Sequence, residues 1–456
     1  MSPPYDVVIL GAGTAGLAAW RAASATTDRV LLVEADRYGT TCARVGCMPS
    51  KLLIAAADAA HQAREAAGFG VQTTVAIDDV AVLDRVRAER DRFVTFPTAS
   101  AEAIPENQRR MGRARFLSDT TLAVGDDVIE TRTTVIATGS RPTLPPVLRG
   151  LGDRVVFNDQ VFDWRRLPRK VALFGLGVIG LELGQALARL GVEVRGFGIS
   201  GTVGPLTDPV IKATALASLS RDFPMQTEAQ VTAVVPEGSG VRVMWREGDA
   251  HCEEAFDVVL AATGRAPNLD GLGLERTSLT LDRRGVPAHD LQTTLCEGAP
   301  IFLAGDAAAD RPLLHEAADE GRIAGLNAAR WPNVAPEARR SPLAVVFTDP
   351  QMLMVGQTWA SLQGQDVITG AVSFEDQGRS RVMRQNQGRL HLYVARATGR
   401  LLGAEGCGPR AEHLGHQIAW VHQLGLTVPQ ILDLPFYHPV VEEGLRTALR
   451  DANGQL

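Results

Sequence analysis

The chain has 456 residues, of which 45% are hydrophobic and 21% are charged, a length that allows about three domains. Its formal net charge is -6 and no basic run stands out, which argues against binding to nucleic acid or to a membrane surface. Five cysteines are too few, and odd in number, for a secreted disulfide framework, so we expect a cytoplasmic protein.

Two apolar stretches, near the N-terminus and at 171–190, are interrupted by polar residues and by regularly spaced glycines. The first contains Asp6, and the second contains Glu182 and Gln185. We therefore interpret neither stretch as a signal peptide or a membrane span.

The first glycine motif follows an expected strand at 5–10 and precedes an expected helix at 17–25. Its glycines are Gly11, Gly13 and Gly16. A second strand, 29–33, ends at Glu34. Strand, glycine motif, helix, strand and acid in this order predict a dinucleotide-binding unit. In such a unit the glycines admit a pyrophosphate and the acid binds a ribose.

Two cysteines, Cys42 and Cys47, lie within residues 39–51. A disulfide needs Cα atoms about 4.4 to 6.8 Å apart, whereas residues five apart on a regular helix rise about 7.5 Å. Gly46 and Pro49 predict an irregular turn that would let the thiols meet. We interpret the pair, with Lys51 beside it, as a redox-active dithiol; two unrelated buried thiols are the alternative. The helix that follows is expected to reach residue 67.

A charged segment at 78–100 predicts a long amphipathic helix with an apolar face. The members of that face are Val82, Val86, Phe93 and Phe96. A β-rich segment follows at 112–124, and a buried strand at 133–142 ends in a glycine turn. Three prolines at 142–146 then predict a linker.

A second strand–glycine–helix–strand unit begins at Lys170. Its glycines are Gly175, Gly177 and Gly180. Two such motifs imply two dinucleotides. Gly198 occupies the position of the ribose-binding acid, and no arginine follows closely to hold a 2′-phosphate. The preference for NAD or NADP therefore stays open, with NAD favoured.

The segment 257–268 repeats the earlier strand and glycine turn, and another strand at 293–304 ends at Gly305-Asp306. The Asp306 carboxylate could bind a hydroxyl or could be a solvated turn residue. A helix at 313–330 is expected to return the chain to the first domain. From about residue 341 the pattern indicates an α+β module, with strands at 345–350, 366–373 and 389–396 and helices near 411–424 and 442–451.

His438 precedes a proline near the end of the chain, and Glu443 follows five residues later. Either residue could lie on an ordinary surface. A rigidly presented histidine beside an acid also suits a general base that is oriented by a carboxylate.

These motifs together resemble the flavin-dependent pyridine nucleotide-disulfide oxidoreductases across essentially the whole chain. Pro49-Ser50-Lys51 and the segment 180–184 are most similar to dihydrolipoyl dehydrogenases. The resemblance implies an α/β fold with two Rossmann-like domains, one for FAD and one for NAD(P), and a C-terminal α+β dimerisation domain. The expected boundaries are 1–148 and 271–338 for the FAD domain, 149–270 for the NAD(P) domain and 339–456 for the dimerisation domain.

The resemblance also implies roles for individual residues. Cys42 would be the interchange thiol, Cys47 the thiolate against the flavin, and His438 with Glu443 the acid–base of the partner's site in a homodimer. Lys51 and Glu182 would form an ion pair near the flavin. The residues that would hold FAD are Gly11, Gly13, Gly16, Glu34, Thr41, Lys51, Gly112, Ala114, Thr138, Gly139, Asp306, Leu313, Leu314 and His315. Those that would hold the nicotinamide nucleotide are Gly175, Gly177, Gly180, Gly264 and Arg265. No metal site is expected.

The implied activity is oxidation of dihydrolipoyl groups with NAD through FAD and the Cys42–Cys47 disulfide. One alternative is an NADPH-dependent reductase of another small disulfide; a second is a flavoprotein that acts mainly as a docked component of a lipoyl-carrying assembly. Four departures from the family pattern bear on substrate choice: Arg44 for asparagine, Phe436-Tyr437 for His-Ala, Gly198 for an acid, and Gln351 for an acid. No C-terminal cysteine pair exists, which counts against mercuric reductase or relay chemistry.

Overall fold

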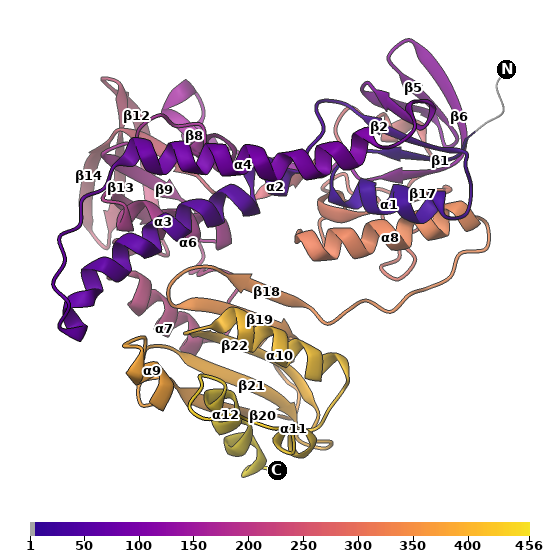
Figure 1. The fold of residues 1–456 in the computed structure, drawn as a ribbon. Coiled ribbons are helices and arrows are strands. Elements are labelled where there is room, and N and C mark those ends of the chain that lie inside the picture. The colour runs from indigo at the N-terminus through magenta and orange to yellow at the C-terminus, as the bar shows by residue number, and fades with distance from the viewer. Residues whose placement is uncertain (1–4) are drawn as a thin grey trace. The chain divides into compact units, whose positions relative to one another are not determined.

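The computed structural model describes residues 5–456, which form two compact units (Figure 1). Unit 1 contains the N-terminal segment up to Pro49, Arg85–Thr143 and Arg265–Arg339. Unit 2 contains Ser50–Asp84, Leu144–Gly264 and Arg340–Leu456. Among the helices of residues 5–456, none combines the length and the apolar character needed to cross a bilayer.

Unit 1 is built on a seven-stranded sheet in the order β3-β2-β1-β6-β5-β4, with β17 paired to β6. Its strands are β1 (Tyr5–Leu10), β2 (Val30–Glu34), β3 (Arg109–Met111), β4 (Ala114–Ser118), β5 (Thr121–Val124), β6 (Asp127–Ile136) and β17 (Ile301–Leu303). The pairs among β3, β2, β1, β6 and β17 are parallel, and β4 and β5 join antiparallel. Runs of buried apolar residues in β1 and β2 are typical of parallel strands covered on both faces. A small ribbon pairs β7 (Ser140–Pro142) with β16 (Arg265–Pro267).

Helices α1 (Thr14–Ser24) and α8 (Leu314–Arg330) lie side by side in unit 1 (Figure 1). A Cβ on Gly321 would lie 2.1 Å from the Ala15 carbonyl oxygen, and one on Gly325 would lie 2.2 Å from that of Ala19. Glycine on α8 is therefore what lets the two helix backbones touch. The structure confirms both predicted helices and places α8 in unit 1 with α1.

The cysteine segment forms α2 (Thr41–Val45) and α3 (Cys47–Glu65), and α4 (Asp79–Glu102) confirms the predicted amphipathic helix. Val86 is fully buried on α4, but Phe96 is 65% exposed. Its assignment to the apolar face was wrong, because ten residues at about 100° each place it about 80° around the helix from Val86.

Unit 2 contains a five-stranded parallel sheet in the order β11-β10-β9-β15-β8. Its elements are β8 (Val155–Phe157), α5 (Asn158–Val161), β9 (Lys170–Phe174), α6 (Val178–Arg189), β10 (Glu193–Phe197), α7 (Pro209–Leu219), β11 (Met225–Gln226) and β15 (Val258–Ala261). An antiparallel sheet, which the sequence analysis did not predict, contains β12 (Gln230–Glu237), β13 (Gly240–Glu247) and β14 (Ala250–Phe256).

The C-terminal part of unit 2 is an antiparallel sheet in the order β18-β19-β22-β21-β20 with helices packed on it. Its elements are β18 (Leu343–Val346), β19 (Gln351–Gly356), β20 (Val367–Ser373), α9 (Gly378–Val382), β21 (Arg389–Ala395), β22 (Leu401–Gly408), α10 (Ala411–Gln423), α11 (Val428–Leu432) and α12 (Glu443–Asn453). The predicted strand 345–350 was wrong in extent, because the chain turns after Val346 and β19 begins at Gln351. Strands β19 and β22 were not predicted; the α+β character and the helices α10 and α12 are confirmed.

Alternate residues of β21 face opposite sides of this sheet. Leu390 and Leu392 belong to the apolar core under α10 and α12. On the other side, His391 Nδ1 lies 2.7 Å from Asp208 Oδ2, and the Tyr393 hydroxyl donates to the same carboxylate at 3.0 Å. Asp208 also caps α7 through Val210 N, so this polar cluster ties α7 to the C-terminal sheet.

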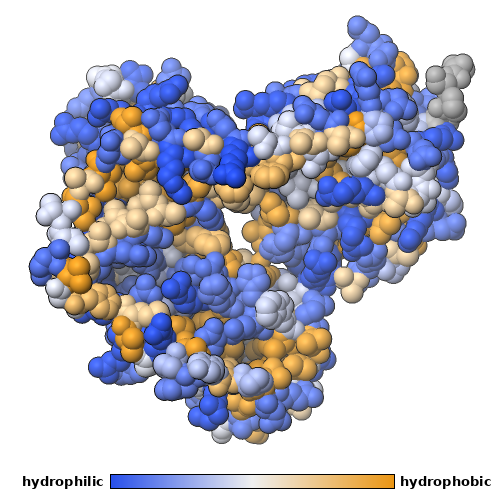
Figure 2. Space-filling view, in the orientation of Figure 1, coloured by the Kyte–Doolittle hydropathy of each residue, from blue (hydrophilic) through white to orange (hydrophobic). Residues whose placement is uncertain are grey.

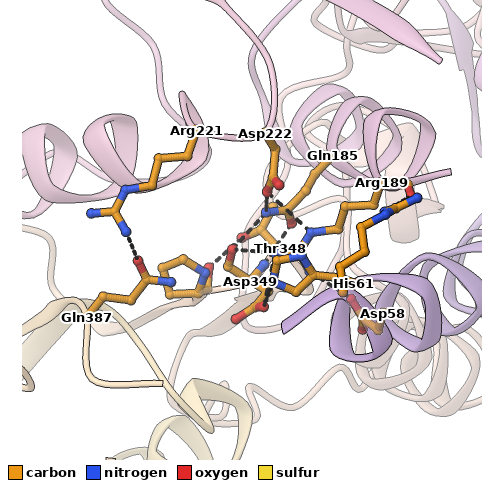
Figure 3. Close-up of polar contacts among 11 residues, drawn as sticks. Asp58, His61, Gln185, Arg189, Arg221, Asp222, Thr348, Asp349 and Gln387 are labelled. Atoms are coloured by element: carbon orange, nitrogen blue, oxygen red, sulfur yellow. Dashed lines mark hydrogen bonds and ion pairs between the residues drawn. The ribbon is translucent and has the colours of Figure 1, made fainter. Parts of the chain in front are cut away.

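Helix α6 is anchored at its C-terminal end by Arg189, whose side chain is only 4% exposed (Figure 3). The guanidinium lies 3.0 Å from Asp58 on α3, 3.3 Å from Asp222 and 3.0 Å from Asp349. A buried cation that loses its partners is costly, by about 3 to 5 kcal/mol. This cluster therefore fixes α6 relative to α3 and to the segment before β19.

Candidate active site

A cleft of about 670 Å³ opens in unit 1 at the carboxyl ends of β1, β2 and β6. Its lining residues are Leu10, Gly11, Gly13, Val33, Glu34, Ala35, Asp36, Arg37, Gly39, Thr41, Arg44, Gly112, Arg113, Ala114, Ala137, Thr138, Gly139, Arg141, Asn268, Asp270 and Leu272. The volume lies in the range of cofactor sites, about 300 to 1,000 Å³. Eight of the predicted FAD-binding residues are therefore brought to one cleft.

The glycines of the first motif build the end of this cleft. Gly11 has φ +105°, and a Cβ there would lie 2.4 Å from the Ala137 carbonyl oxygen. A Cβ on Gly16 would lie 1.7 Å from the Gly11 carbonyl oxygen, whereas one on Gly13 would meet nothing within 4 Å. Gly13 is also the N-cap of α1 and makes no side-chain cap. The space beside Gly13 at the start of α1 is thus open, as the close approach of an anionic pyrophosphate requires.

Glu34 closes β2 and reaches back to the glycine motif. Its Oε2 accepts a hydrogen bond from Ala12 N at 2.7 Å, and its Oε1 accepts one from Asp36 N at 3.0 Å. A carboxylate can accept further hydrogen bonds on its remaining lone pairs. The cleft, the uncapped helix and this acid together fit FAD.

The two cysteines lie on either side of a break between helices. Cys42 lies on α2 and Cys47 begins α3, with Gly46 at φ -120° and ψ -115° between the helices. A Cβ on Gly46 would lie 3.2 Å from Cys42 Cα, closer than nine in ten real contacts. The irregular turn predicted from Gly46 and Pro49 is thus present.

The structure carries the two cysteines as thiols that interact with each other. A hydrogen bond with Cys47 and then burial raise the pKa of the Cys42 thiol. Cys42 also lies between two cleft-lining residues, Thr41 and Arg44. A thiol pair in this position can exchange electrons with a cofactor in the cleft.

Asp306, Gly16 and the segment 313–315 do not line the cleft. Asp306 follows β17, and its Oδ2 accepts a hydrogen bond from Ser140 Oγ at 2.6 Å. Arg265 Nε donates to the same Ser140 Oγ at 2.9 Å. Arg265, predicted for the nicotinamide nucleotide, thus lies in unit 1 with Asp306, whereas Gly264 belongs to unit 2.

The turn at Gly305-Asp306 is held by Glu320 of α8, which is 2% exposed. Glu320 Oε2 accepts from Gly305 N at 2.7 Å, and Oε1 lies 2.7 Å from Arg339 Nη2. Burial outweighs Arg339 and raises the pKa of Glu320 to about 7. Glu320 is a positioning residue that the sequence analysis did not identify.

We expect Glu320→Gln to flatten the pH dependence of stability. A native pKa of about 7 against 4.5 means that the folded protein holds this proton more tightly, so the contribution of Glu320 to stability is full below pH 4.5 and is lost as pH rises through 7. The difference corresponds to at most about 3 kcal/mol of unfolding free energy. The thermal unfolding midpoint of the FAD-loaded variant, minus that of wild type, should therefore rise between pH 5 and pH 8.

Glu337→Gln is the control for that measurement. An ion pair with Arg322 lowers the pKa of Glu337, so its contribution is lost only as pH falls below 4.5. Its midpoint relative to wild type should stay constant between pH 5 and pH 8. An equally constant difference for Glu320→Gln would contradict the assignment.

The second glycine motif, in unit 2, repeats the geometry of the first. Gly175 has φ +103°, and a Cβ there would lie 2.2 Å from the Ala262 carbonyl oxygen. Gly180 packs on Gly175, and Gly177 is the N-cap of α6 with open space before it. This repetition supports a second dinucleotide.

Lys51 and Glu182 form the predicted ion pair within unit 2. Lys51 Nζ donates to both carboxylate oxygens, at 2.9 and 2.7 Å, and Glu182 is 4% exposed. Phe347 N donates to Glu182 Oε1 at 2.9 Å, and Lys51 Nζ lies 4.7 Å from the Phe347 ring centroid. Phe347 therefore holds both partners of the pair, a role that no motif in the sequence signals.

His438 and Glu443 are also brought together, at the start of α12. His438 Nδ1 lies 3.0 and 3.1 Å from the two Glu443 oxygens, and Val440 N donates to the same carboxylate at 3.2 Å. The hydrogen bond with His438 lowers the pKa of Glu443. The His438 side chain is 80% exposed, so its other nitrogen is open to an incoming group.

Comparisons with known proteins agree with this arrangement. Residues 5–321 match the family described as pyridine nucleotide-disulphide oxidoreductase, and residues 343–449 match its dimerisation domain. Dihydrolipoyl dehydrogenase 2 of Haloarcula marismortui is 30% identical over 467 residues, covering 99% of this chain and 97% of the relative. The mercuric reductase of Shigella flexneri is 31% identical, covering 99% of this chain and 81% of the relative.

Solved structures show the same fold. LpdA from Mycobacterium tuberculosis has a TM-score of 0.83 and 26% identity, covering 97% of this chain and 98% of that one. The flavoprotein disulfide reductase RclA from Escherichia coli has a TM-score of 0.82 and 24% identity, covering 99% of this chain and 100% of that one. The expected α/β architecture with a C-terminal dimerisation domain is thereby confirmed. The cleft, the cysteine pair and the two glycine motifs have their explanation in this likeness: the chain belongs to the pyridine nucleotide-disulphide oxidoreductase family and is a flavin disulfide oxidoreductase with Cys42 and Cys47 as its redox pair.

Proposed function

We propose that the protein oxidises dihydrolipoyl groups with NAD. The observation that carries this proposal is the ion pair between Lys51, on the helix that begins at Cys47, and Glu182 on α6, in a sequence context that most resembles dihydrolipoyl dehydrogenases. The dihydrolipoyl dehydrogenase of Haloarcula marismortui, similar over 99% of this chain, supports it.

In this proposal His438, oriented by Glu443, accepts a proton from the substrate dithiol. The resulting thiolate attacks Cys42 of the oxidised Cys42–Cys47 disulfide and forms a mixed disulfide, releasing Cys47 as thiolate. The second substrate sulfur then displaces Cys42, so that the substrate leaves as a disulfide and both cysteines are reduced. Bound FAD supplies the route by which that electron pair reaches the nicotinamide as hydride.

The residues that we propose to hold FAD are those of the cleft in unit 1, together with Asp306, which bonds to Ser140, and the segment 313–315. Gly175, Gly177, Gly180, Gly264 and Arg265 are proposed for the nicotinamide nucleotide. The family implies both groups.

We also propose a cytoplasmic homodimer in which each protomer supplies His438 to the partner's site. The chain carries the dimerisation domain at 343–449. Figure 2 shows hydrophobic surface over this C-terminal module. Its exposed large apolar residues include Trp420, Leu424 and Tyr437, at 63%, 73% and 80%. The domain boundaries near residues 148, 270 and 338 belong to the same proposal.

Steady-state assays of the purified FAD-loaded protein test the function. Dihydrolipoamide with NAD should turn over at about 1 to 1,000 s⁻¹, a typical enzymatic range. The rival is an NADPH-dependent reductase of another small disulfide, which the missing acid at Gly198 leaves open. Faster turnover of glutathione disulfide with NADPH would replace the proposal by that rival.

Arg44, which stands where the family usually has asparagine, should strengthen FAD binding. It lines the cleft, its Cδ lies 3.0 Å from where a Cβ on Gly39 would be, and its Nη1 donates to the Arg37 carbonyl at 3.3 Å. A guanidinium beside a diphosphate makes a charge-assisted contact, so Arg44→Asn should weaken FAD affinity about tenfold. Flavin fluorescence titration of the apoprotein measures it.

Arg37→Asn is the matched control, because Arg37 also lines the cleft but its side chain is 71% exposed. We expect its FAD affinity to change less than threefold, on the order of one screened surface charge. Equal losses in the two variants would show that Arg44 has no special contact.

A further inference from the structure

The two dinucleotide units differ at two equivalent positions, the residue between the first two glycines and the residue at the end of the second strand. In the first, the residue between the first two glycines is the small Ala12, and the Glu34 carboxylate accepts a hydrogen bond from its N–H. In the second, the corresponding residue is Leu176, 2% exposed, and Gly198 stands at the position of Glu34. Compared with the first unit, the second therefore lacks the carboxylate and has a leucine side chain between its first two glycines.

Leu176 fills the space that an acid after β10 would need. A Cβ on Gly198 would lie 2.9 Å from Leu176 Cδ1 and 3.3 Å from the Thr227 carbonyl oxygen. A Cβ on Gly196 would lie 2.9 Å from Leu176 Cδ2. Contacts under 3.0 Å require a neighbour to shift, so both glycines make room for the buried Leu176 side chain, and a carboxylate at position 198 would need that side chain to move.

One carboxylate and one ammonium group lie beside the loop that follows β10. A Cβ on Gly201 would lie 3.4 Å from Glu228 Oε1 and 3.9 Å from Lys212 Nζ, one anion and one cation. The same loop folds over the motif, because Gly204 N donates to the Leu176 carbonyl at 2.9 Å. These two opposite charges do not by themselves favour a ribose 2′-phosphate over a 2′-hydroxyl.

An acid at this position acts twice: it accepts a hydrogen bond from the ribose 2′-hydroxyl and repels a 2′-phosphate. Without the acid, the hydrogen bond to the 2′-hydroxyl and the repulsion of a 2′-phosphate are both lost. We propose that the second unit does not discriminate at the ribose 2′ position and binds NAD(H) and NADP(H) with comparable affinity, Leu176 being the residue that removes the discrimination. This inference rests on the proposed function only in that a nicotinamide nucleotide binds at the second motif.

Binding to the FAD-loaded protein tests the proposal without turnover. The probes are the 1,4,5,6-tetrahydro analogues of NADH and NADPH, which cannot transfer hydride, titrated by calorimetry. Wild type should bind the two analogues within about tenfold of each other. The double variant Leu176→Ala/Gly198→Glu should shift the ratio toward the NADH analogue by about 10- to 100-fold, the effect of one charged hydrogen bond.

Two single variants locate the cause. Gly198→Glu alone should shift the ratio much less than the double variant and should lower the thermal unfolding midpoint, because Leu176 still occupies the space. Ser239→Glu, in the exposed turn between β12 and β13, adds the same charge and should leave the ratio unchanged.

Either of two results overturns the proposal. One is a wild-type preference above 100-fold for one analogue; the other is a full shift from Gly198→Glu alone. The wild-type preference is measured without any variant, so poor folding of the double variant cannot obscure it. Competition by adenosine 2′,5′-bisphosphate and by 5′-AMP gives a second measurement of the same preference on wild type. Strong discrimination with active dihydrolipoamide turnover removes this inference alone, whereas comparable binding without such turnover removes the proposed substrate alone.

Discussion

Cys42→Ser should abolish turnover of dithiol and disulfide substrates, to below about 1% of wild type, because a hydroxyl cannot enter thiol–disulfide exchange. The thiol it replaces interacts with Cys47 and lies between two residues that line the cleft. FAD content should be unchanged, since serine keeps the shape of α2. Dihydrolipoamide oxidation measures turnover through the cysteine pair, and flavin absorbance measures FAD content. Reduction of an artificial acceptor such as ferricyanide by NADH measures whether the flavin site still works without the cysteines.

Cys252→Ser is the matched control, because Cys252 is a half-buried thiol on β14 that is remote in sequence from the redox pair. It should retain dihydrolipoamide turnover. Loss of ferricyanide reduction in Cys42→Ser would mean that the substitution damages the flavin site itself. Retained dihydrolipoamide turnover in Cys42→Ser would remove the pair from the mechanism.

His438→Ala should lower turnover with dihydrolipoamide by about 10²- to 10⁴-fold, the usual contribution of a general base. The imidazole is exposed and held by the Glu443 carboxylate at 3.0 Å, the geometry of an oriented base. Reduction of ferricyanide by NADH needs no proton from a dithiol and should stay within twofold. Steady-state kinetics of both reactions on one preparation give the comparison.

Two further variants sharpen this prediction. Glu443→Gln keeps a hydrogen-bond partner but loses the charge, so we expect a loss of about tenfold, smaller than that for His438→Ala. His413→Ala, on the exposed part of α10, should leave turnover unchanged. A loss under tenfold for His438→Ala would transfer the role of base to another group.

Local patterns predicted the parts of the site that are close in sequence. The two glycine motifs and the break at Gly46 follow from spacing and backbone sterics, which act over a few residues. Contacts between distant segments carried no such signal. Phe347 reaches Glu182 and Lys51 from a segment that the sequence analysis assigned to one strand, and Glu320 reaches Gly305 because α8 folds back on the turn that follows β17.

Cleft residues in loops were also missed. Arg37 and Arg113 line the cleft from segments that have no periodicity, where a side chain's direction depends on turn geometry. The hairpin of β18 and β19 was missed for a related reason, since Val345 to Pro350 is apolar enough to resemble one strand. The turn between β18 and β19, which carries Phe347, lies within these same residues.

Unit 1 is assembled from three separate stretches of chain, and this sets an order of events during synthesis. The strand β17 that pairs with β6, and the helix α8 that covers α1, emerge from the ribosome only after all of the second glycine motif and its sheet. Until then the β6 edge and the Ala15–Ala19 face of α1 have no native partner, and such edges invite wrong pairing. Ordinary elongation at about 5 to 20 residues per second makes this interval about ten seconds or more. The flavin cleft is therefore completed late, and a nascent chain that stalls between the two motifs would carry the redox cysteines without the finished domain that surrounds them.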